Sequence, residues 1–359
     1  MKTTPLYNLH LKSGARMMSF AGWNVPLQYK SILAEATAVR TSVGLFDVSH
    51  MGRFLVTGPR ALDLLQSLTT NDVGRLEVGR GQYTLMLNET GGVIDDLTVF
   101  RTGLETYMLV VNAANAEKDL SWISSQADDR VRIADITEST VLFALQGPKA
   151  GEMLFIACKE GLPDLRRFAF VKVEIAGGAC TLLRTGYTGE DGYEIQCDAG
   201  DAIAIWEALR SVGEPLGLAL CGLGARDLLR IEAGYMLYDH EISEEHNPIE
   251  AGLTRFVRMD KGDFVGRSAI AEILENGPRR LLTGLMMSDR MVPRGGSLVT
   301  LKGHEVGQVT SGTFSPSIER GIGLCYVTAE KSISGLEVEV IVREKPYAGR
   351  IASPPFYRT

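Results

Sequence analysis

The sequence predicts an α+β protein that ends in a small all-β domain. Two blocks of the chain carry strand-like and helix-like runs in the same order, and after about residue 277 the runs become short, strand-like and broken by glycines. At 359 residues the chain is longer than the roughly 250–300 residues at which a single hydrophobic core stops growing. We therefore expect two or three packed units.

The first block has the pattern of a meander of short strands between two helices. Gly91 and Gly92 separate two apolar runs, which is typical of a hairpin. Apolar residues at helical spacing predict one helix before the meander and another after it. The expected strands span 83–88, 93–100 and 107–112, and the expected helices span 60–68 and 115–126.

The second block repeats this order. Strand-like runs at 171–178 and 179–197 precede a helix at 201–212 and a helical stretch at 222–234. The matching order suggests an internal duplication that builds one pseudo-symmetric domain, although identity between the blocks is too low to prove it. The strand-like runs of the expected C-terminal domain lie at 281–287, 295–312, 321–327 and 336–342.

The composition is that of an ordinary globular protein, with 45% hydrophobic and 23% charged residues. A net charge of −7 and the lack of a basic stripe argue against a nucleic-acid partner. No run approaches the roughly 18 apolar residues of a membrane span, and the first residues show neither a signal-peptide nor a transit-peptide pattern. We therefore expect a cytoplasmic protein without a membrane partner.

The cysteines and histidines show no metal-binding pattern. The five histidines lack the spacing of a metal-ligand motif, so we expect no metal. We assign His50 no chemical role, because no recognisable motif places a Ser or Cys nucleophile beside it. Five scattered cysteines without a CxxC pair favour reduced, structural thiols: Cys158, Cys180, Cys197, Cys221 and Cys325.

Asp95 and Asp96 interrupt an apolar strand. Because side chains alternate across a strand, the two carboxylates face opposite sides. If helices cover the face of the neighbouring valines and leucine, Asp96 points to the other face, where it can act as an acid or base or stabilise a cation. Residues of adjacent strands that could share this face and form a pocket wall are Tyr83, Val110 and Asn112. The alternative is an Asp pair with a purely structural role.

Two glycine-rich segments also carry polar side chains. Residues 184–194, RTGYTGEDGYE, predict a hairpin that presents a tyrosine and acids, and they lack the GK[ST] ending of a phosphate loop. Residues 222–230, GLGARDLLR, place Gly-x-Gly before a helix, but the third glycine and the preceding parallel strand of a dinucleotide site are not evident. A plain hairpin and a solvated helix face with Arg226 and Arg230 remain the alternatives.

Short motifs occur in one order along almost the whole chain. They are TPLY near the start, AGW at 21–23, VRTSVGLFDVSHMG at 39–52, TNDV at 70–73, NETGGVIDDL at 88–97, VNAAN at 111–115, KDLSWI at 118–123, LQGPKA at 145–150, RTGYTGEDGYE at 184–194, GLGARDLLRIEAG at 222–234, DFVGR at 263–267, TSGTFSP at 310–316 and PFYR at 355–358. Each motif alone is modest, but the ordered set is highly specific. It resembles the T-protein of the glycine cleavage system over its full length.

The resemblance implies a three-domain cloverleaf with folate in a central opening. It implies a duplicated ferredoxin-like α+β domain, a Greek-key-like β domain and a C-terminal jelly-roll-like β domain. The implied boundaries are 1–54, 136–165 and 242–276 for a discontinuous first domain, 55–135 and 166–241 for the duplicated folate-binding domain, and 277–359 for the C-terminal domain.

The resemblance also implies an activity and a site. The implied aminomethyltransferase moves the one-carbon unit of an aminomethyl group from the dihydrolipoyl arm of its partner, H-protein, to tetrahydrofolate, and it forms the 5,10-methylene derivative and ammonia. Asp96 matches the essential carboxylate of the family. The positions that match folate contacts are Met51, Tyr83, Val110, Asn112, Tyr187, Glu194 and Arg226.

One position departs from the family pattern, because Arg255 stands where many relatives carry a tryptophan near the folate. Three alternative functions remain. A folate-dependent demethylating enzyme would use the same fold. A folate-binding accessory protein for iron–sulfur clusters is disfavoured by Asp263, which replaces the cysteine of that group's motif. A catalytically dead interaction module is disfavoured by the presence of Asp96.

Overall fold

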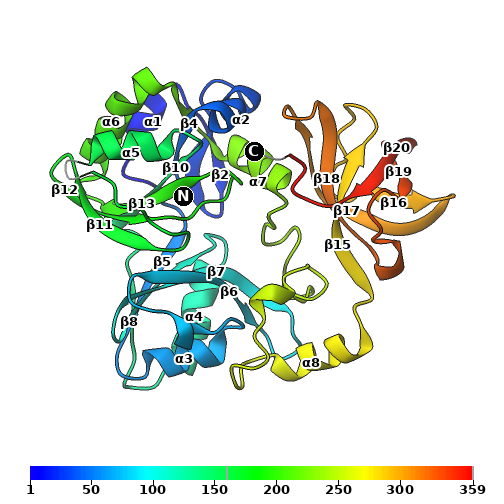
Figure 1. Cartoon of the computed structure of the whole chain (residues 1–359), viewed down its shortest axis with the longest axis horizontal. Helices are drawn as coiled ribbons and strands as arrows, with labels where there is room; N and C mark the ends of the chain where they lie inside the picture. Colours follow the sequence, from blue (N-terminus) through cyan, green and yellow to red (C-terminus); the bar gives the residue numbers. More distant parts are fainter. Residues whose placement is uncertain (159–160, 358–359) are drawn as a thin grey trace. The chain divides into compact units, whose positions relative to one another are not determined.

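The computed structural model describes residues 1–158 and 161–357, and Figure 1 labels the helices and strands along the chain. The chain divides into two compact units. The first unit contains Met1–Leu65, Val73–Tyr83 and Leu97–Asp227. The second unit contains Gln66–Asp72, Thr84–Asp96 and Leu228–Thr359.

The first block forms the predicted meander between two helices. Its strands make a five-stranded sheet in the order β6-β7-β8-β5-β9. Antiparallel pairing sets Thr98 of β7 opposite Val110 of β8, and Gly52 of β5 opposite Val111 of β8. The elements are β5 (Gly52–Thr57), α3 (Ala61–Leu68), β6 (Arg80–Leu87), β7 (Val93–Gly103), β8 (Thr106–Val111), α4 (Ala116–Gln126) and β9 (Arg132–Asp135).

The second block contributes to a six-stranded sheet in the order β11-β12-β13-β10-β4-β14. The glycine-rich segment 184–194 connects β12 to β13, as the hairpin prediction requires. The elements are β4 (Val43–Asp47), β10 (Thr140–Gln146), α5 (Ala150–Ala157), β11 (Phe170–Ile175), β12 (Gly178–Leu183), β13 (Gly192–Asp198), α6 (Ala202–Gly213), η2 (Glu214–Leu216) and β14 (Leu218–Cys221).

The two blocks share one order of elements: strand, helix, three strands, helix, strand. In each block the first strand pairs antiparallel with the fourth, β5 with β8 and β10 with β13. This repetition supports an internal duplication. The domain boundaries stay a prediction. Strand β10, which lies in 136–165, pairs on one side with β13 of the second block and on the other with β4, which lies in 1–54.

The core of the second sheet explains which way β13 faces. Tyr193, Ile195 and Cys197 alternate along β13 and belong to one hydrophobic cluster, so Glu194 lies on the opposite face. Trp206 of α6 is fully buried in the same cluster. Glu194, a candidate site residue, therefore lies on the face of the sheet that is turned away from this cluster.

The chain begins with a small three-stranded sheet in the order β1-β3-β2. A helix follows whose start is capped by Ser31, since the Ser31 hydroxyl accepts a hydrogen bond from the Ala34 N–H at 3.2 Å. The elements are β1 (Lys2–Thr3), α1 (Tyr7–Lys12), β2 (Arg16–Phe20), β3 (Trp23–Gln28) and α2 (Ile32–Thr41).

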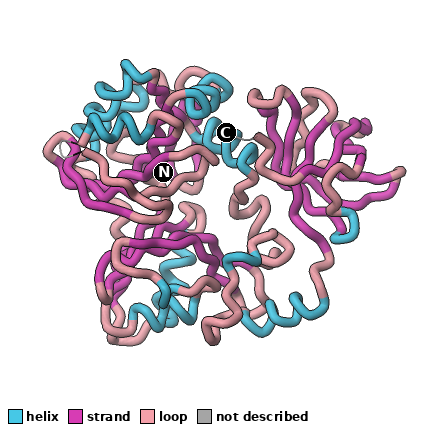
Figure 2. Tube along the Cα trace, in the orientation of Figure 1, coloured by secondary structure: helices cyan, strands magenta, loops and turns pink. Residues whose placement is uncertain are grey.

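The expected C-terminal β domain is present as a closed barrel in the order β15-β18-β17-β16-β19-β20. Figure 2 shows that strands make up most of it. Val338, Val340 and Val342 alternate along β19 into the barrel core. The elements are β15 (Arg280–Met287), β16 (Leu298–Leu301), β17 (His304–Ser315), β18 (Arg320–Thr328), η4 (Ala329–Lys331), β19 (Glu337–Val342) and β20 (Lys345–Ala352).

The remaining helical elements are η1 (Val73–Arg75), α7 (Leu223–Ala233), η3 (Thr254–Phe256) and α8 (Arg267–Asn276). Among the described residues, no helix is long and apolar enough to span a membrane. In the same residues no group of three or more His, Cys, Asp or Glu side chains is placed to hold a metal ion. All five cysteines are buried and free.

Candidate functional site

Four of the predicted site residues lie in the first unit, on or beside the five-stranded sheet. Val110 is on β8, and Tyr83 is on β6. Asn112 directly follows β8, and Met51 directly precedes β5, whose first residue pairs with the last residue of β8. Met51, Tyr83 and Asn112 are half-buried, whereas Val110 is buried. The sheet thus places Met51 and Asn112 at the same end of two paired strands.

Arg53 holds the turn that carries Met51. Its guanidinium is completely buried and donates hydrogen bonds to the backbone oxygens of Ser49, at 3.1 Å, and of Met51. It also donates to the Thr140 hydroxyl of β10 at 2.9 Å. Burial lowers the pKa of Arg53 to about 10, so the side chain stays charged at neutral pH. A buried cation satisfied by backbone oxygens fixes the local chain path.

The pair of aspartates on β7 shows the predicted alternation. Asp95 is 0% exposed, like Val93 before it, whereas Asp96 and Thr98 are half-buried. The two carboxylates therefore lie on opposite faces of the strand, and Asp96 lies on the more accessible one. Asp96 belongs to the second unit, with residues 84–95.

The glycine turn before β7 is held by a loop of the second unit. The Val93 N–H donates to the backbone oxygens of Ser243, at 2.9 Å, and His246, at 3.0 Å. A Cβ atom on Gly92 would lie 1.9 Å from the backbone oxygen of Glu244, so only glycine fits. The start of β7, three residues before Asp96, is thereby fixed by close backbone packing.

Three further predicted site residues come together in the first unit. The guanidinium carbon of Arg226 lies 4.6 Å from the centroid of the Tyr187 ring. Burial lowers the pKa of Arg226, while nearby Glu194 and Tyr187 act in the opposite direction. Glu194 is half-buried and accepts a hydrogen bond from the Thr185 hydroxyl. The contact is a cation–π interaction, and the N–H groups of a guanidinium can also donate to a ligand.

The hairpin that carries Tyr187 is closed by Gln146 of β10. The Gln146 amide donates to the Thr185 oxygen at 3.1 Å, and its side-chain oxygen accepts from the Thr188 hydroxyl at 2.9 Å. A Cβ atom on Gly186 would lie 1.9 Å from that oxygen, so Gln146 needs a glycine there. The glycines of 184–194 therefore make room for a buried amide.

The start of α7 is fixed by a buried acid and two glycines. Glu35 is 2% exposed and accepts a hydrogen bond from the Gly222 N–H at 2.9 Å. A Cβ atom on Gly222 would lie 2.3 Å from the backbone of Leu27, and one on Gly224 would lie 2.5 Å from Ile32. The Gly-x-Gly motif is thus explained by packing, not by a dinucleotide, and it sets the position of Arg226 one turn further along.

Sequence reasoning missed a buried polar network around Asp47, the last residue of β4. Its carboxylate accepts hydrogen bonds from the Thr4 hydroxyl at 2.6 Å and from the Ser49 N–H at 3.0 Å, and its Oδ2 atom is 2.9 Å from His10 Nε2. Burial favours the neutral acid, but the hydrogen bonds from His10, Ser49 and Thr4 lower the pKa of Asp47 to about 2. The FDVSHMG motif was the available signal for this network.

His50 lies next to this network and was assigned no role. It is 3% exposed, and its ring meets the Phe20 ring edge to face at 5.7 Å. Its Nδ1 atom is buried and has no hydrogen-bond partner among the described residues. Burial, followed by nearby Arg226, lowers the pKa of His50 to about 4, so the imidazole is neutral at pH 7.

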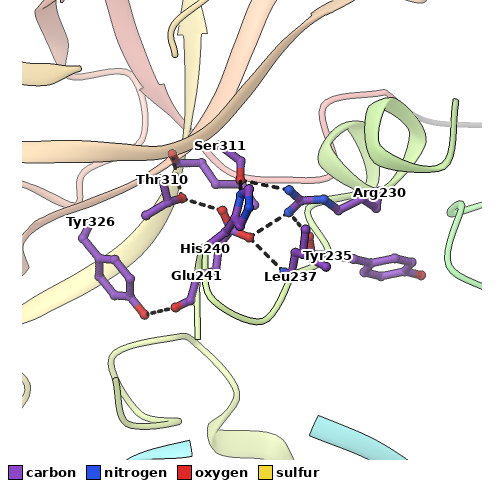
Figure 3. Close-up of polar contacts among 9 residues, drawn as sticks. Arg230, Tyr235, Leu237, His240, Glu241, Thr310, Ser311 and Tyr326 are labelled. Atoms are coloured by element: carbon purple, nitrogen blue, oxygen red, sulfur yellow. Dashed lines mark hydrogen bonds and ion pairs between the residues drawn. The ribbon is translucent and has the colours of Figure 1, made fainter. Parts of the chain in front are cut away.

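A second buried network lies in the second unit, between the end of α7 and the barrel (Figure 3). Arg230 and Glu241 form an ion pair at 2.7 Å, and their side chains are 1% and 0% exposed. Arg230 also donates to the Ser311 hydroxyl at 2.9 Å, and the Thr310 hydroxyl donates to Glu241 at 2.6 Å. Ser311 Oγ is 3.0 Å from His240 Nδ1. Arg230 therefore faces the barrel rather than solvent.

Comparison with known proteins covers both units. The chain matches the GCVT N-terminal domain over residues 6–261 and the glycine cleavage T-protein C-terminal barrel domain over residues 279–358. The aminomethyltransferase of Symbiobacterium thermophilum is 50% identical, with 100% of this chain and 98% of the relative covered. That of Geobacillus kaustophilus is 46% identical, with 100% and 99% covered. The crystal structure of glycine cleavage system aminomethyltransferase T from Bartonella henselae is 37% identical, has a TM-score of 0.92, and is matched over 99% of this chain and 98% of that one.

Proposed function

Because the chain belongs to the glycine cleavage T-protein family, we propose that it carries out that family's reaction with the side chains described above. The motif-based resemblance is confirmed, and the chain is an aminomethyltransferase of the glycine cleavage system. In the proposed reaction, the aminomethyl group on the dihydrolipoyl arm of H-protein gives its one-carbon unit to tetrahydrofolate. The products are 5,10-methylenetetrahydrofolate and ammonia.

The cluster of Arg226, Tyr187 and Glu194 is the observation that carries the folate assignment. A pterin ring has an edge of N–H donors beside a carbonyl oxygen. An ionised carboxylate such as Glu194 suits the donors, because it accepts two parallel hydrogen bonds. Arg226, whose guanidinium carbon lies 4.6 Å from the centroid of the Tyr187 ring, can donate N–H groups to the carbonyl oxygen. The cluster thus offers an acceptor for the N–H donors of the pterin and a donor for its carbonyl oxygen.

Asp96 has the proposed catalytic role. Cleavage of the carbon–sulfur bond and loss of ammonia both pass through iminium-like cations. A fixed carboxylate stabilises such a charge where water is excluded. Asp96 is half-buried on the accessible face of β7, which is the exposure such a role requires. It also helps to orient the reacting folate amine, and positioning supplies further acceleration.

The finer geometry remains part of the proposal. We place the folate in the central opening that the family fold implies, with Met51, Tyr83, Val110 and Asn112 as wall residues. We also propose the three-domain division, the docking of H-protein and a cytoplasmic location. The chemistry of iminium formation and capture needs no metal.

Arg255 makes one side of the proposed folate site different from that of many relatives. Its side chain is exposed, and its guanidinium carbon lies 4.6 Å from the centroid of the Phe256 ring. The stacked pair offers a flat apolar and cationic surface where many relatives have a tryptophan. We therefore expect this chain to differ from those relatives in its preference for polyglutamate forms of folate, since these forms differ in negative charge.

A reconstituted assay tests the proposal. The protein is mixed with aminomethylated H-protein and tetrahydrofolate, and methylenetetrahydrofolate and ammonia are followed together. We expect equal amounts of both products and no turnover when H-protein is omitted. Turnover of a methylated amine or sulfonium compound without H-protein would replace the proposal with the demethylating enzyme.

A further inference from the structure

A small cavity lies in the first unit between β3, the end of β4 and the start of α7. Its volume is about 10 Å³, which is room for one molecule of the size of water. Its lining includes the apolar side chains of Val25 and Val48 and the polar side chains of Asp47, His50 and Arg226. The cavity therefore adjoins Arg226, whose guanidinium lies over the Tyr187 ring.

Among the polar groups of the lining, the His50 imidazole has a hydrogen-bonding position that no described residue uses. Asp47 is occupied, because its two oxygens already take hydrogen bonds from Thr4, His10 and Ser49. The Cys221 thiol, which also lines the cavity, is directed at the backbone oxygens of Glu35 and Ala219. His50 Nδ1 has no partner among the described residues. A buried nitrogen without a partner costs roughly 1–3 kcal/mol, so a molecule that satisfies it is favoured.

The charges around the cavity favour a neutral guest. Burial and Arg226 lower the pKa of His50 to about 4, and the imidazole therefore adds no charge at pH 7. The guanidinium of Arg226 repels a cation. The negative charge of Asp47 is compensated by its own hydrogen-bond donors. An ammonium ion would also lose its hydration shell in so small a space. Neutral ammonia fits, since it is as small as water and can donate to or accept from an imidazole nitrogen.

We propose that this cavity is a binding site for ammonia, the product of the aminomethyltransferase reaction, with His50 Nδ1 as its hydrogen-bond partner. Held there as the neutral molecule, ammonia leaves the reacting centre without recombining with the iminium-like carbon. In the reverse reaction the same site supplies ammonia as the nucleophile. Its nitrogen then bonds to the methylene carbon, both bonds from that carbon to folate nitrogens break, and a carbon–sulfur bond forms to the dihydrolipoyl arm. Ammonia and the thiol each lose one proton, and the two folate nitrogens take these protons up.

The reverse reaction provides the test. Methylenetetrahydrofolate, reduced H-protein and ammonium chloride are supplied, and the KM of each substrate is measured for the wild type, His50→Leu and His50→Asn. Leucine removes the nitrogen at similar volume, whereas asparagine keeps a polar atom near the Nδ1 position. For His50→Leu we expect the KM for ammonium to rise about tenfold, as for one lost hydrogen bond, with the KM for methylenetetrahydrofolate changed less than about twofold. For His50→Asn we expect a KM for ammonium close to that of the wild type.

An unchanged KM for ammonium in His50→Leu, or an equal rise in all three KM values, would overturn the proposal and leave a water molecule as the occupant. If His50→Leu does not fold, methylammonium tests the wild type directly. Its methyl group needs more room beside His50 than a hydrogen atom does, so competitive inhibition at concentrations near the KM for ammonium would also overturn the proposal. The forward assay separates this outcome from a failure of the proposed function, because it measures turnover of the wild type without added ammonium.

Discussion

Asp95 and Asp96 are neighbours in the chain, but the strand gives them different surroundings. Asp95 is completely buried with the core face of β7, while Asp96 is half-buried on the other face. Replacing the carboxyl group at 96 by an amide should therefore affect chemistry, and the same change at 95 should affect folding. The two side chains make a matched pair of positions for substitution.

We expect Asp96→Asn to lower kcat about 10²–10³-fold while folate still binds, because the cation loses its fixed counter-charge but the side chain keeps its shape. Turnover is measured in the reconstituted assay, and folate binding by fluorescence or calorimetry. Asp95→Asn is the control, with a lower unfolding temperature and a much smaller change in kcat. A near-wild-type rate in Asp96→Asn would remove Asp96 from the catalytic role.

His50 should make stability depend on pH. Its pKa is about 4 in the folded protein against an ordinary value of 6.5, so between these values only the unfolded chain binds the proton. Stability is therefore complete above pH 6.5 and falls as the pH drops toward 4, by at most about 3 kcal/mol. We expect urea unfolding of His50→Asn to show a shallower loss over this window than the wild type.

Two other groups with lowered pKa values do not interfere with this comparison. The pKa of Asp47 is lowered from 3.8 to about 2, so its contribution is lost only below pH 3.8. The pKa of His246 is also lowered, by burial and by Arg280, but this effect is common to both proteins and cancels in their difference. Identical pH slopes in the two proteins would show that His50 is not held neutral.

At the residue scale, the sequence predicted what depends on local geometry. Alternation along one strand is a local rule, so the separation of Asp95 from Asp96 could be predicted. The environment of His50 depends on long-range contacts, since Phe20 and Arg226 reach it from positions 30 residues before and 176 residues after it in the chain. No local pattern reports such contacts, and His50 was therefore passed over.

At the scale of elements, the start of α7 shows how backbone packing positions a side chain. Gly222 fits against the backbone of Leu27, where a Cβ atom would lie at 2.3 Å, and its N–H donates to Glu35. Backbone atoms cannot move aside as a flexible side chain can. A methyl group at 222 must therefore displace the first turn of α7, which carries Arg226.

We expect Gly222→Ala to destabilise the protein by about 1–3 kcal/mol and to raise the KM for folate, because Arg226 moves with the helix. Gly200→Ala is the matched control, since a Cβ atom there meets nothing within 4 Å. Urea unfolding and folate kinetics of the two variants check the prediction. If Gly222→Ala binds folate as tightly as Gly200→Ala does, the start of α7 does not set the position of Arg226.

The elements that were predicted differ physically from those that were missed. The meander has alternating apolar residues and a Gly-Gly turn, which are signals of short range. Strand β20, with the sequence KPYAGRIA, was not expected, because proline and glycine interrupt its alternation. Helix α8 has only one buried residue, Ile270, so it shows little of the apolar stripe on which a helix prediction depends.

At the scale of the whole chain, the family and the arrangement of domains come from different kinds of information. The ordered motifs extend from residue 4 to residue 358, and the matched family regions extend over nearly the same length. The motifs therefore sufficed for the family. They carry no information on which strands share a sheet, so no partners were predicted for β10, which pairs with β13 and β4. Pairing of distant strands is a property of the folded chain.

The barrel offers the last prediction, through the buried ion pair of Arg230 and Glu241. Removing one partner leaves an uncompensated charge in a site that is 1% exposed or less, so we expect Arg230→Met to cost about 3–5 kcal/mol of stability. The double variant Arg230→Met with Glu241→Gln should recover a large part of this loss, because neither charge then remains. Urea unfolding of the wild type, both single variants and the double variant gives the coupling free energy. Strict additivity would mean that the two charges do not stabilise each other, and that the other bonds of Arg230, to Ser311 and to the Tyr235 oxygen, hold this end of α7 against the barrel.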